Sequence, residues 1–317
     1  MFDILQVAFL KDFRYNLSMV VSLIMRRFIL GTDWWTDCDD AVAMRILARA
    51  HKSGEINIKG IGINACMEYS VTSLEGFLNK EGIQIPIGID LDATDFGGNP
   101  PYQKNLSKFS SRYCSNEDAE DAVRLYRRIL ACSDRPLEII EIGYLQVIAN
   151  VLESSPDDIS SKNGYDLVKE KVSKIWVMAG KWDEDFGKEN NFIRNSRSKK
   201  AGNIVCNKCP VPVTFLGWEI GFDVITGDNL DKNDVLYKVL CDHGSYNGRP
   251  SWDPMLVLMA IIGDEAAAGY DVVCGTASVD CETGANHFLP DKNGLHKYVS
   301  KIKDNNYYKN LINQRLI

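Results

Sequence analysis

Residues 28–40 read FILGTDWWTDCDD, and this stretch decides the fold. Its first four residues are apolar or glycine, which is typical of a short buried strand. A polar segment follows, and from residue 40 to residue 50 the apolar side chains recur with the period of an α-helix. The stretch therefore predicts a strand, a loop and the start of a helix. Its loop and helix start hold four acidic residues, Asp33, Asp37, Asp39 and Asp40.

The rest of the chain repeats this alternation of apolar strands and amphipathic helices. Strands are expected at residues 56–63, 85–89, 137–142, 174–178, 212–216 and 272–279. Helices are expected at residues 69–78, 145–153 and 254–262, from a capping-box pattern at 115–118 as far as 132, and from 295 onward. This alternation predicts an α/β fold, with a mostly parallel central sheet and helices on both faces. We expect one domain over residues 28–317, with ligands beyond the carboxyl ends of the strands.

The composition is that of an ordinary globular protein, with 317 residues of which 45% are hydrophobic and 25% charged. A net charge of −7 argues against nucleic acid as a partner, because a face that binds nucleic acid is basic. The sequence holds no run of 18 apolar residues, so we expect no membrane partner. Nine scattered cysteines indicate reduced thiols in a cytoplasmic protein, with Cys206 and Cys209 as loop cysteines.

Residues 1–27 are expected to form an N-terminal extension in which charged residues interrupt an apolar segment. Two interpretations of this extension stay open. It is an amphipathic helix that precedes the domain, or it lies upstream of a true start at Met25.

The four acidic residues of the first loop are costly to bring together. Two like charges about 4 Å apart repel by about 4 kcal/mol at an effective dielectric constant of about 20. A bound cation removes this cost, and ligands that are all oxygen suit a hard ion such as Ca²⁺ or Mg²⁺. The alternative is an acidic helix N-terminus that the helix dipole stabilises, which explains Asp37 better than Asp33.

Two polar segments later in the chain offer partners for this loop. Residues 252–254 (Trp-Asp-Pro) place one carboxylate at a helix start, where Asp253 is either a simple N-cap or a ligand. Residues 189–191 (Glu-Asn-Asn) follow a predicted strand, and their carboxylate and amides can pair with sugar hydroxyls.

In this combination the chain resembles the nucleoside hydrolase family, the inosine-uridine-preferring N-ribohydrolases, as a divergent member. The acidic loop is similar to a longer variant of the family's first motif, close to DTDxGTDxDD. Asp253 matches the aspartate of a later His-Asp-Pro segment. Residues 189–191 match the family's Glu-aromatic-Asn segment, and residues 178–180 match its Met-Gly-Gly. Residues 142–147 correspond loosely to its Thr-Gly-Pro-Leu-Thr-Asn segment. The resemblance runs from about residue 28 to about residue 279.

The resemblance implies a Ca²⁺ ion held by Asp33, by both oxygens of Asp40, by the backbone carbonyl of Ile142 and by Asp253. It implies hydrolysis of the N-glycosidic bond of ribonucleosides or related ribosides by a water at the ion, with Asp33 as the general base. The implied substrate-binding residues are Asp39, Asn64, Glu189, Asn191 and Trp252. The implied partner is a small-molecule riboside, and the implied assembly is a homo-oligomer.

Two departures from the family pattern concern tryptophans. Trp34 and Trp35 replace the Pro-Gly of the first motif, and their rings either stack on a ligand or only pack the loop. Trp252 replaces the His that is a candidate acid for the leaving base in many members, and an indole cannot supply that proton. His243 is the candidate substitute.

Two other functions stay open on the sequence alone. The missing His favours a catalytically silent protein that binds ribose or a nucleoside and keeps the metal site. The other hypothesis is a phosphotransferase with Asp33 as its nucleophile, but Trp35 stands where the DxD spacing of such enzymes needs a second acid. The sequence leaves the preferred leaving group undetermined.

Overall fold

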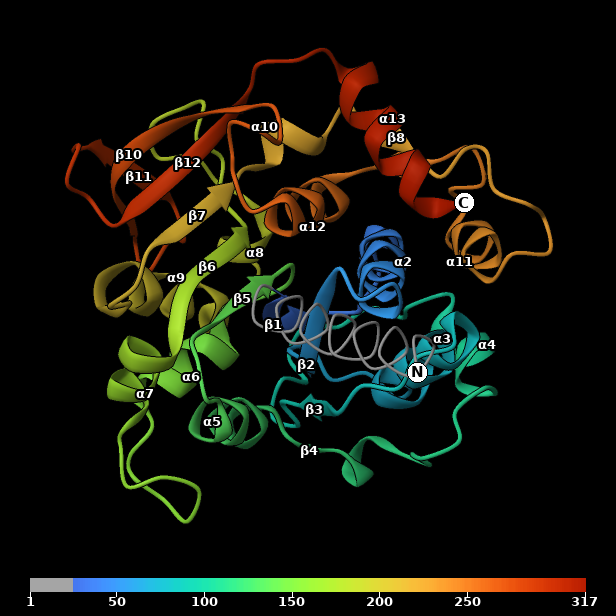
Figure 1. The fold of residues 1–317 in the computed structure, drawn as a ribbon, viewed down its shortest axis with the longest axis horizontal. Helices are drawn as coiled ribbons and strands as arrows, with labels where there is room; N and C mark the ends of the chain where they lie inside the picture. Colours follow the sequence, from blue (N-terminus) through green and yellow to red (C-terminus); the bar gives the residue numbers. More distant parts are fainter. Residues whose placement is uncertain (1–24) are drawn as a thin grey trace, which may run out of the picture.

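A sheet of ten strands forms the centre of the molecule (Figure 1). The computed structural model describes residues 25–317. In sheet order, the strands are β11 (Asn286–Pro290), β10 (Tyr270–Val279), β12 (His296–Lys301), β7 (Val213–Leu216), β6 (Val172–Met178), β5 (Leu137–Glu141), β1 (Arg26–Thr32), β2 (Ile56–Ile63), β3 (Ile87–Ile89) and β4 (Glu120–Asp121). Neighbouring strands from β12 to β4 run parallel, whereas β10 is antiparallel to both of its neighbours. The prediction of a mostly parallel sheet is confirmed.

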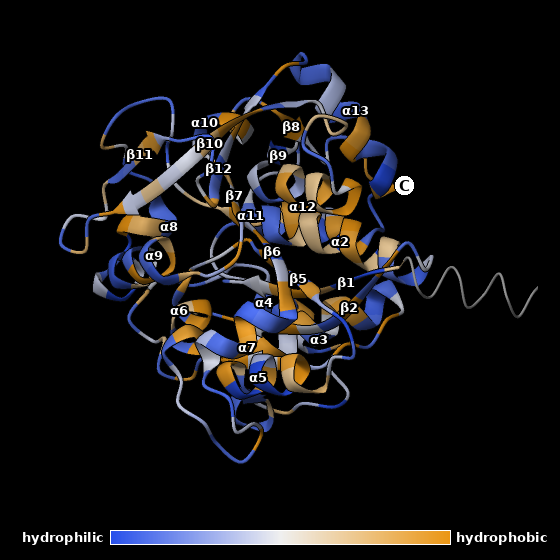
Figure 2. Ribbon diagram, turned by 60° about the vertical axis from the view of Figure 1, so that its left-hand side comes forward, coloured by the Kyte–Doolittle hydropathy of each residue, from blue (hydrophilic) through white to orange (hydrophobic). Residues whose placement is uncertain are grey.

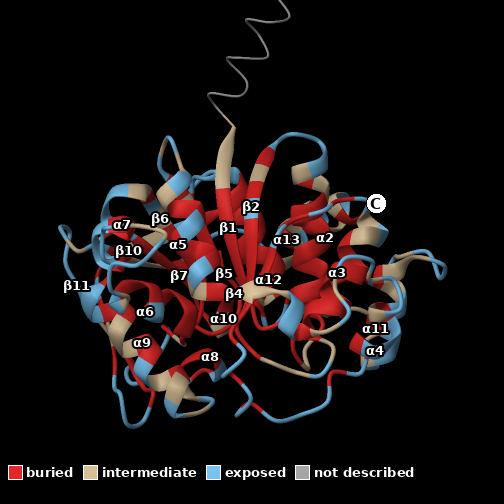
Figure 3. Ribbon diagram, turned by 90° about the horizontal axis from the view of Figure 1, so that it is seen from below, coloured by how far each residue is buried: buried red, intermediate tan, exposed pale blue. Residues whose placement is uncertain are grey.

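Helices cover both faces of this sheet. One face packs against α2 (Asp39–Lys52), α3 (Ser70–Glu81), α11 (Val235–His243), α12 (Trp252–Ile262) and α13 (Asn305–Leu316). The other face packs against α5 (Ala122–Cys132), α6 (Gln146–Glu153), α7 (Gly164–Lys171) and α9 (Ser196–Lys208). Side chains alternate along β1, so Phe28 and Leu30 join the first core and Ile29 joins the second. Figure 3 shows β1, β2 and β5 mostly buried between the two layers.

Short elements connect these layers. They are α4 (Gln103–Ser107), a 3₁₀ turn (Asn116–Asp118), α8 (Asn190–Ile193), α10 (Trp218–Gly221) and the small antiparallel pair β8 (Ile225–Thr226) and β9 (Arg249–Pro250). Several of them lie at the carboxyl ends of the parallel strands, where a ligand is expected.

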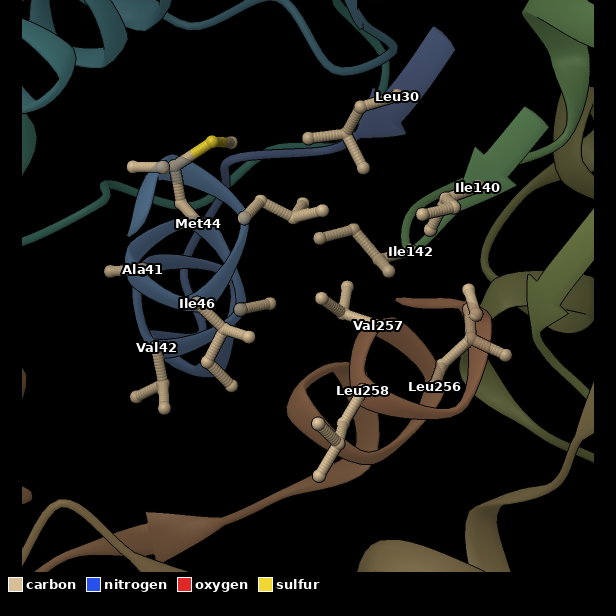
Figure 4. Close-up of a cluster of buried hydrophobic side chains, with 14 of the residues drawn as sticks. Leu30, Ala41, Val42, Met44, Ile46, Ile140, Ile142, Leu256, Val257 and Leu258 are labelled. Carbon is tan, nitrogen blue, oxygen red and sulfur yellow. The ribbon is translucent and has the colours of Figure 1, made fainter. Parts of the chain in front are cut away.

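The contact between α2 and α12 determines where the acidic loop lies. Figure 2 shows the two helices side by side, with α12 hydrophobic along most of its length. In Figure 4, Val257 of α12 lies beside Ile142, which follows β5, and both face α2. Leu30 of β1 and Met44 of α2 belong to the same buried cluster. This packing brings the N-terminal ends of α2 and α12 together, and with them their acidic residues.

The predicted helix from residue 295 onward is wrong in its first part. His296–Lys301 form β12, and α13 begins only at Asn305. The reason is a partner on each side, because β12 pairs with both β7 and β10. His296 is buried, and its Nδ1 accepts a hydrogen bond of 2.9 Å from the backbone N of Ala277.

Two predicted helix starts also shift. Ser115 and Asp118 do form a capping box, but it opens only the 3₁₀ turn, and α5 begins at Ala122 with Asp121 as its cap. Ser251 is the N-cap residue of α12, so Asp253 lies in the first turn of that helix and does not cap it. Its carboxylate is therefore available for another role.

Residues 1–24, which make up most of the predicted N-terminal extension, lie outside the described residues. Arg26 and Arg27, the last residues of that extension, belong to β1. From residue 25 to the last residue, no helix combines the length and the apolar character that crossing a bilayer requires. All nine cysteines are free. Cys206 and Cys209 are not loop cysteines, because Cys206 lies in α9 and Cys209 directly follows it, and both are buried.

Glu141 at the end of β5 requires a glycine beside it. Its Oε1 accepts hydrogen bonds from Asn64 Nδ2 at 2.8 Å and from the backbone N of Gly143 at 3.0 Å. Complete burial raises the pKa of this carboxyl to about 8. Gly31 is its partner on β1, and a Cβ atom on Gly31 would lie 1.9 Å from Glu141 Oε2. Only glycine fits at residue 31.

We therefore expect Gly31→Ala to lower the free energy of unfolding by about 1–3 kcal/mol, the usual penalty for overpacking. Denaturant unfolding measures this loss. In a Glu141→Asp background, where the side chain is one methylene shorter, the same Gly31→Ala change should destabilise less. Equal losses in the two backgrounds would show that the clash with Glu141 is not the cause.

Candidate active site

A cavity of about 350 Å³ opens at the carboxyl ends of β1, β5 and β6. The residues that line it are Asp33, Trp35, Thr36, Asp37, Asp39, Asp40, Ile142, Met178, Glu189, Asn190, Asn191, Arg194, Trp218, Trp252 and Asp253. They come from segments more than 200 positions apart in the sequence. The cavity is at the edge of the sheet where the alternation of strands and helices led us to expect a ligand.

Buried carboxylates crowd one wall of this cavity. One oxygen each of Asp39, Asp40 and Asp253 lies within 4.8 Å of the other two. Burial first, and then neighbouring carboxylates, raise the pKa values of these three groups well above the ordinary value. Asp33 is within hydrogen-bond contact of Asp40, and burial followed by the charge of Asp37 raises the pKa of Asp33 to about 8. Such a group of carboxylates needs protons or a cation to be stable.

Hydrogen bonds from the backbone and from one hydroxyl hold the carboxylates in place. Thr32 Oγ1 donates a hydrogen bond to Asp40, and the backbone N of Trp34 donates to Asp40 Oδ1 at 3.2 Å. The backbone N of Asp253 donates to Asp39 Oδ2 at 3.1 Å, which joins the starts of α2 and α12 directly. The wall is therefore preorganised.

A second layer of residues holds the acidic loop from behind, and the sequence analysis did not find it. Tyr102 Oη lies 2.7 Å from the carbonyl oxygen of Trp35 and 2.8 Å from that of Asp37. Gln103 Nε2 donates to the carbonyl oxygen of Trp34 at 2.5 Å. The only signal was the length of the polar segment around them, because long loops in compact domains are often functional.

The two adjacent tryptophans have different roles. Trp34 has φ +44° and is fully buried, and its indole Nε1 donates to Ser73 Oγ at 2.8 Å. Trp35 lines the cavity, and its ring lies 4.4 Å from the guanidinium carbon of Arg194. Trp34 therefore packs the loop, whereas Trp35 can contact a ligand.

Glu189 and Asn191 lie in the same cavity as the carboxylates. Glu189 caps α8, and its carboxylate accepts hydrogen bonds from the backbone N of Asn191 at 2.9 Å and of Gly180 at 3.0 Å. Burial raises the pKa of Glu189 to about 7. Asn191 Nδ2 donates to the carbonyl oxygen of Met178 at 2.9 Å. Both side chains are held in place by their own neighbourhood before any ligand binds.

Asn64 does not line the cavity. It is fully buried, with Nδ2 on Glu141 and Oδ1 accepting from the backbone N of Tyr144 at 2.9 Å. Asn64 thus supports the turn that presents Ile142 to the cavity, and it lies behind the wall.

Three tryptophans supply the aromatic part of the cavity. Trp252 Nε1 donates to the carbonyl oxygen of Trp218 at 2.7 Å, and the two rings stack with centroids 6.3 Å apart. Trp35 is the third, and Trp218 was missed by the sequence analysis because no motif marks it. These rings offer flat apolar surfaces next to the carboxylates.

His243 is outside the cavity, at the end of α11. Its Nδ1 lies 2.8 Å from Ser245 Oγ, and burial lowers its pKa. The nearby Asp37 forms a two-point ion pair with Arg249, in which Nε lies 2.8 Å from Oδ1 and Nη2 lies 2.5 Å from Oδ2. His243 lies near Asp37 and Cys38 but does not line the cavity.

No model of a known protein family matches the sequence, and no curated protein matches it. Solved structures do match it over most of the chain. An inosine-guanosine nucleoside hydrolase superposes with a TM-score of 0.66 at 17% identity, covering 92% of this chain and 98% of its own. The chain has the nucleoside hydrolase fold.

Two further structures share this nucleoside hydrolase fold. The inosine-uridine preferring nucleoside hydrolase from Bacillus anthracis gives a TM-score of 0.62 at 13% identity, covering 92% of this chain and all (100%) of its own. The type III effector protein XopQ, solved with adenosine diphosphate ribose, gives a TM-score of 0.65 at 14% identity. The match covers 96% of this chain and 99% of XopQ. The resemblance drawn from the sequence motifs is confirmed as a shared fold with low sequence identity.

The crowded carboxylates predict an unusual pH dependence for the metal-free protein. Because burial raises the folded-state pKa of Asp33 to about 8 from an ordinary 3.8, the protonated form is favoured in the fold. The protonated carboxyl of Asp33 therefore contributes to the free energy of unfolding. Relative to high pH, this contribution is fully present below the ordinary pKa of 3.8 and is lost as pH rises towards about 8. We therefore expect the melting temperature of chelator-treated protein to fall by several degrees between about pH 5 and pH 8.

Asp33→Asn should make this fall smaller, and excess Ca²⁺ should oppose it in the wild-type protein. Melting curves across the pH range measure both effects. A melting temperature of the metal-free wild type that rises between these two pH values would contradict the assigned electrostatics.

Proposed function

We propose that this protein hydrolyses the N-glycosidic bond of ribonucleosides or related ribosides at a Ca²⁺ site. One observation carries the proposal. Aspartates from the first loop and from α12 share one cavity with Glu189 and Asn191, so an acidic ion site faces a sugar-binding pair.

The donor set fits a hard divalent cation. All candidate ligands are oxygens, and they are Asp33, Asp40, the backbone carbonyl of Ile142 and Asp253. One oxygen of Asp39 lies within 4.8 Å of an oxygen of Asp40 and of Asp253, so Asp39 is next to the proposed ion as well as to the proposed sugar. The number of carboxylates and the room in the cavity favour Ca²⁺ over the smaller Mg²⁺. When bound, the ion lowers the pKa of water and supplies the positive charge that lets these carboxylates ionise.

Asp33 is the proposed general base. Next to a cation its pKa falls below the value of about 8 that burial imposes, so its carboxylate is free to accept a proton at neutral pH. Water then adds to the anomeric carbon as its proton moves to Asp33. The bond from that carbon to the leaving group breaks, and the electron pair leaves with that group.

Glu189, Asn191 and Asp39 are proposed to hold the ribose hydroxyls. Carboxylates accept hydrogen bonds from hydroxyl groups, and their negative charge stabilises the oxocarbenium-like transition state. Since Glu189 and Asn191 are already held by backbone groups, little ordering is needed when the sugar binds.

The leaving group is proposed to lie against the aromatic wall. Trp252 and Trp218 suit a planar ring, and Arg194 brings a cation to the same cavity. XopQ was solved with adenosine diphosphate ribose, which supports ribosides other than simple nucleosides as candidates.

A catalytically silent riboside-binding protein is the second candidate. Trp252 cannot protonate a leaving group, and His243 lies outside the cavity. The release of reducing sugar from a panel of ribosides, measured with and without Ca²⁺, separates the two candidates. Calcium-dependent binding without turnover would favour the silent protein.

A cytoplasmic location and a homo-oligomer complete the proposal. Nine free thiols support a reducing compartment. Sedimentation of the purified protein measures the oligomeric state.

We expect Asp33→Asn to reduce kcat by at least about 100-fold, because an amide cannot accept the proton from water. Steady-state kinetics measures this loss, and circular dichroism checks that the fold is kept. Asp242→Asn, which changes an exposed carboxylate outside the cavity, is the matched control and should keep wild-type turnover. Wild-type turnover in Asp33→Asn would refute the role of this residue as the base.

Ca²⁺ at 100 times its Kd should stabilise the wild type by about 2.7 kcal/mol. Asp253→Ala should lose most of this gain without loss of stability in chelator, since the change removes a buried charge from a like-charged group. Thermal shift with and without Ca²⁺ measures both states, with Asp242→Ala as the control. A drop in chelator as large as the drop in Ca²⁺ would show that Asp253 has only a structural role.

A further inference from the structure

A second cavity, of about 900 Å³, lies at the other end of α2 and shares no lining residue with the acidic one. The C-terminal ends of α2, α3 and α13 meet the N-terminal end of α11 there. Figure 1 shows α13 and α11 next to the label of the C-terminus. With a rise of 1.5 Å for each residue, α2 separates its acidic start from this cavity by about 15–20 Å.

The lining of this cavity is strongly basic, although the whole chain carries a net charge of −7. Its six cationic side chains are Arg45, Arg49, Lys52, Lys80, Lys238 and Arg315. Its two acidic side chains are Glu81 and Asp234, and Ile317 adds at most one terminal carboxylate. Phe109, which is 42% exposed, supplies an aromatic surface.

Both acidic side chains are already occupied by one arginine. Arg45 is only 3% exposed, and its Nε lies 2.6 Å from Glu81 Oε1 while its Nη2 lies 2.6 Å from Asp234 Oδ1. It also donates from Nη1 to the carbonyl oxygen of Leu316 at 3.1 Å. Arg45 thus joins four elements at the floor of the cavity and pairs with both acids, so its single charge offsets one of the two.

The other cations of the lining have few anionic partners. Arg315 pairs with Glu55, which is outside the cavity. Among residues 25–317, Arg49, Lys52, Lys80 and Lys238 form no ion pair; Lys52 Nζ donates to the carbonyl oxygen of Glu81 at 3.3 Å. Lys80 Nζ lies 3.7 Å from the ring centroid of Phe109. The cavity therefore has a surplus of positive charge.

Helix dipoles explain only part of this surplus. Arg49, Lys52 and Lys80 lie in the last turns of α2 and α3, where the partial negative charge of a helix end favours cations. Lys238 is the fourth residue of α11, near the positive end of that helix, where a cation is unfavourable. Arg49 also acts by its charge on Glu81 and Asp234. An anion in the cavity would compensate Lys238 and the other cations that exceed the two acids of the lining.

We propose that this basic cavity binds a small polyphosphate anion of the nucleoside di- or triphosphate class. A terminal phosphate carries more than one negative charge and three terminal acceptor oxygens, and each inner phosphate carries one charge and two such oxygens. These groups match the guanidinium and ammonium groups converging from α2, α3 and α11. The volume accommodates a mononucleotide, and the ring of Phe109 offers a stacking surface for its base. The site is independent of riboside hydrolysis.

Isothermal titration of the full chain with inorganic tripolyphosphate and with ATP, in about 0.15 M salt, tests the proposal. We expect saturable binding of both, weakened at least tenfold in Arg49→Glu/Lys238→Glu. Arg49→Gln/Lys238→Gln is the milder variant and should weaken binding in the same direction. Phe109→Ala should weaken ATP binding and leave tripolyphosphate binding unchanged.

Two controls separate this cavity from other sources of binding. Lys169→Glu/Lys200→Glu makes the same charge change on α7 and α9 and should leave binding unchanged. Because polyphosphates also bind divalent ions, Asp253→Asn, which alters only the acidic cavity, should bind tripolyphosphate as the wild type does. Wild-type affinity in Arg49→Glu/Lys238→Glu, an equal loss in the Lys169/Lys200 control, or no saturable binding would each overturn the proposal.

Discussion

Repulsion between carboxylates at the start of two packed helices is the constraint on which the site depends. The side-by-side packing of α2 and α12 brings oxygens of Asp39, Asp40 and Asp253 within 4.8 Å of one another in a buried pocket. Hydrophobic burial over the lengths of both helices holds this contact together, because the charges themselves oppose it. Packing of the apolar core therefore holds the three carboxylates in an arrangement that a cation would stabilise.

The residues around this cluster are arranged to keep it in place. Backbone N–H groups and Thr32 hold the carboxylates from in front, while Tyr102 and Gln103 hold the loop carbonyls from behind. Glu141, buried beneath the loop, requires the glycine at residue 31. A site with a rigid support needs little reorganisation when charge develops in a bound substrate, which is the condition for electrostatic catalysis.

Helix α2 joins two regions of opposite charge. Its first residues belong to the acidic cavity, and its last turn contributes Arg49 and Lys52 to the basic one. In both regions the direction of the helix dipole agrees with the charges nearest to it. The proposed cation site and the proposed anion site thus lie at opposite ends of one helix.

The sequence by itself determined the alternation of strands and helices, the mostly parallel sheet and the acidic loop at its edge. Local periodicity carries this information, because the pattern within residues 28–40 alone predicts a strand, a polar loop and the start of a helix. The motif order also indicated that Asp253 and Glu189 would join the loop, and the cavity contains both.

Only the tertiary structure decided the rest. Residues 296–301 became a strand because β7 and β10 offered it partners on both sides, which no local pattern records. Trp34 and Trp35 are adjacent and chemically identical, yet one is buried in the core and the other faces the cavity, because the positive φ of Trp34 turns the loop between them. Contacts between segments far apart in the chain also decide the positions of Asn64, Tyr102 and Trp218. The same kind of contact forms the basic cavity. Such contacts exist only once the chain is folded, because packing and the pairing of distant polar groups are properties of the assembled core.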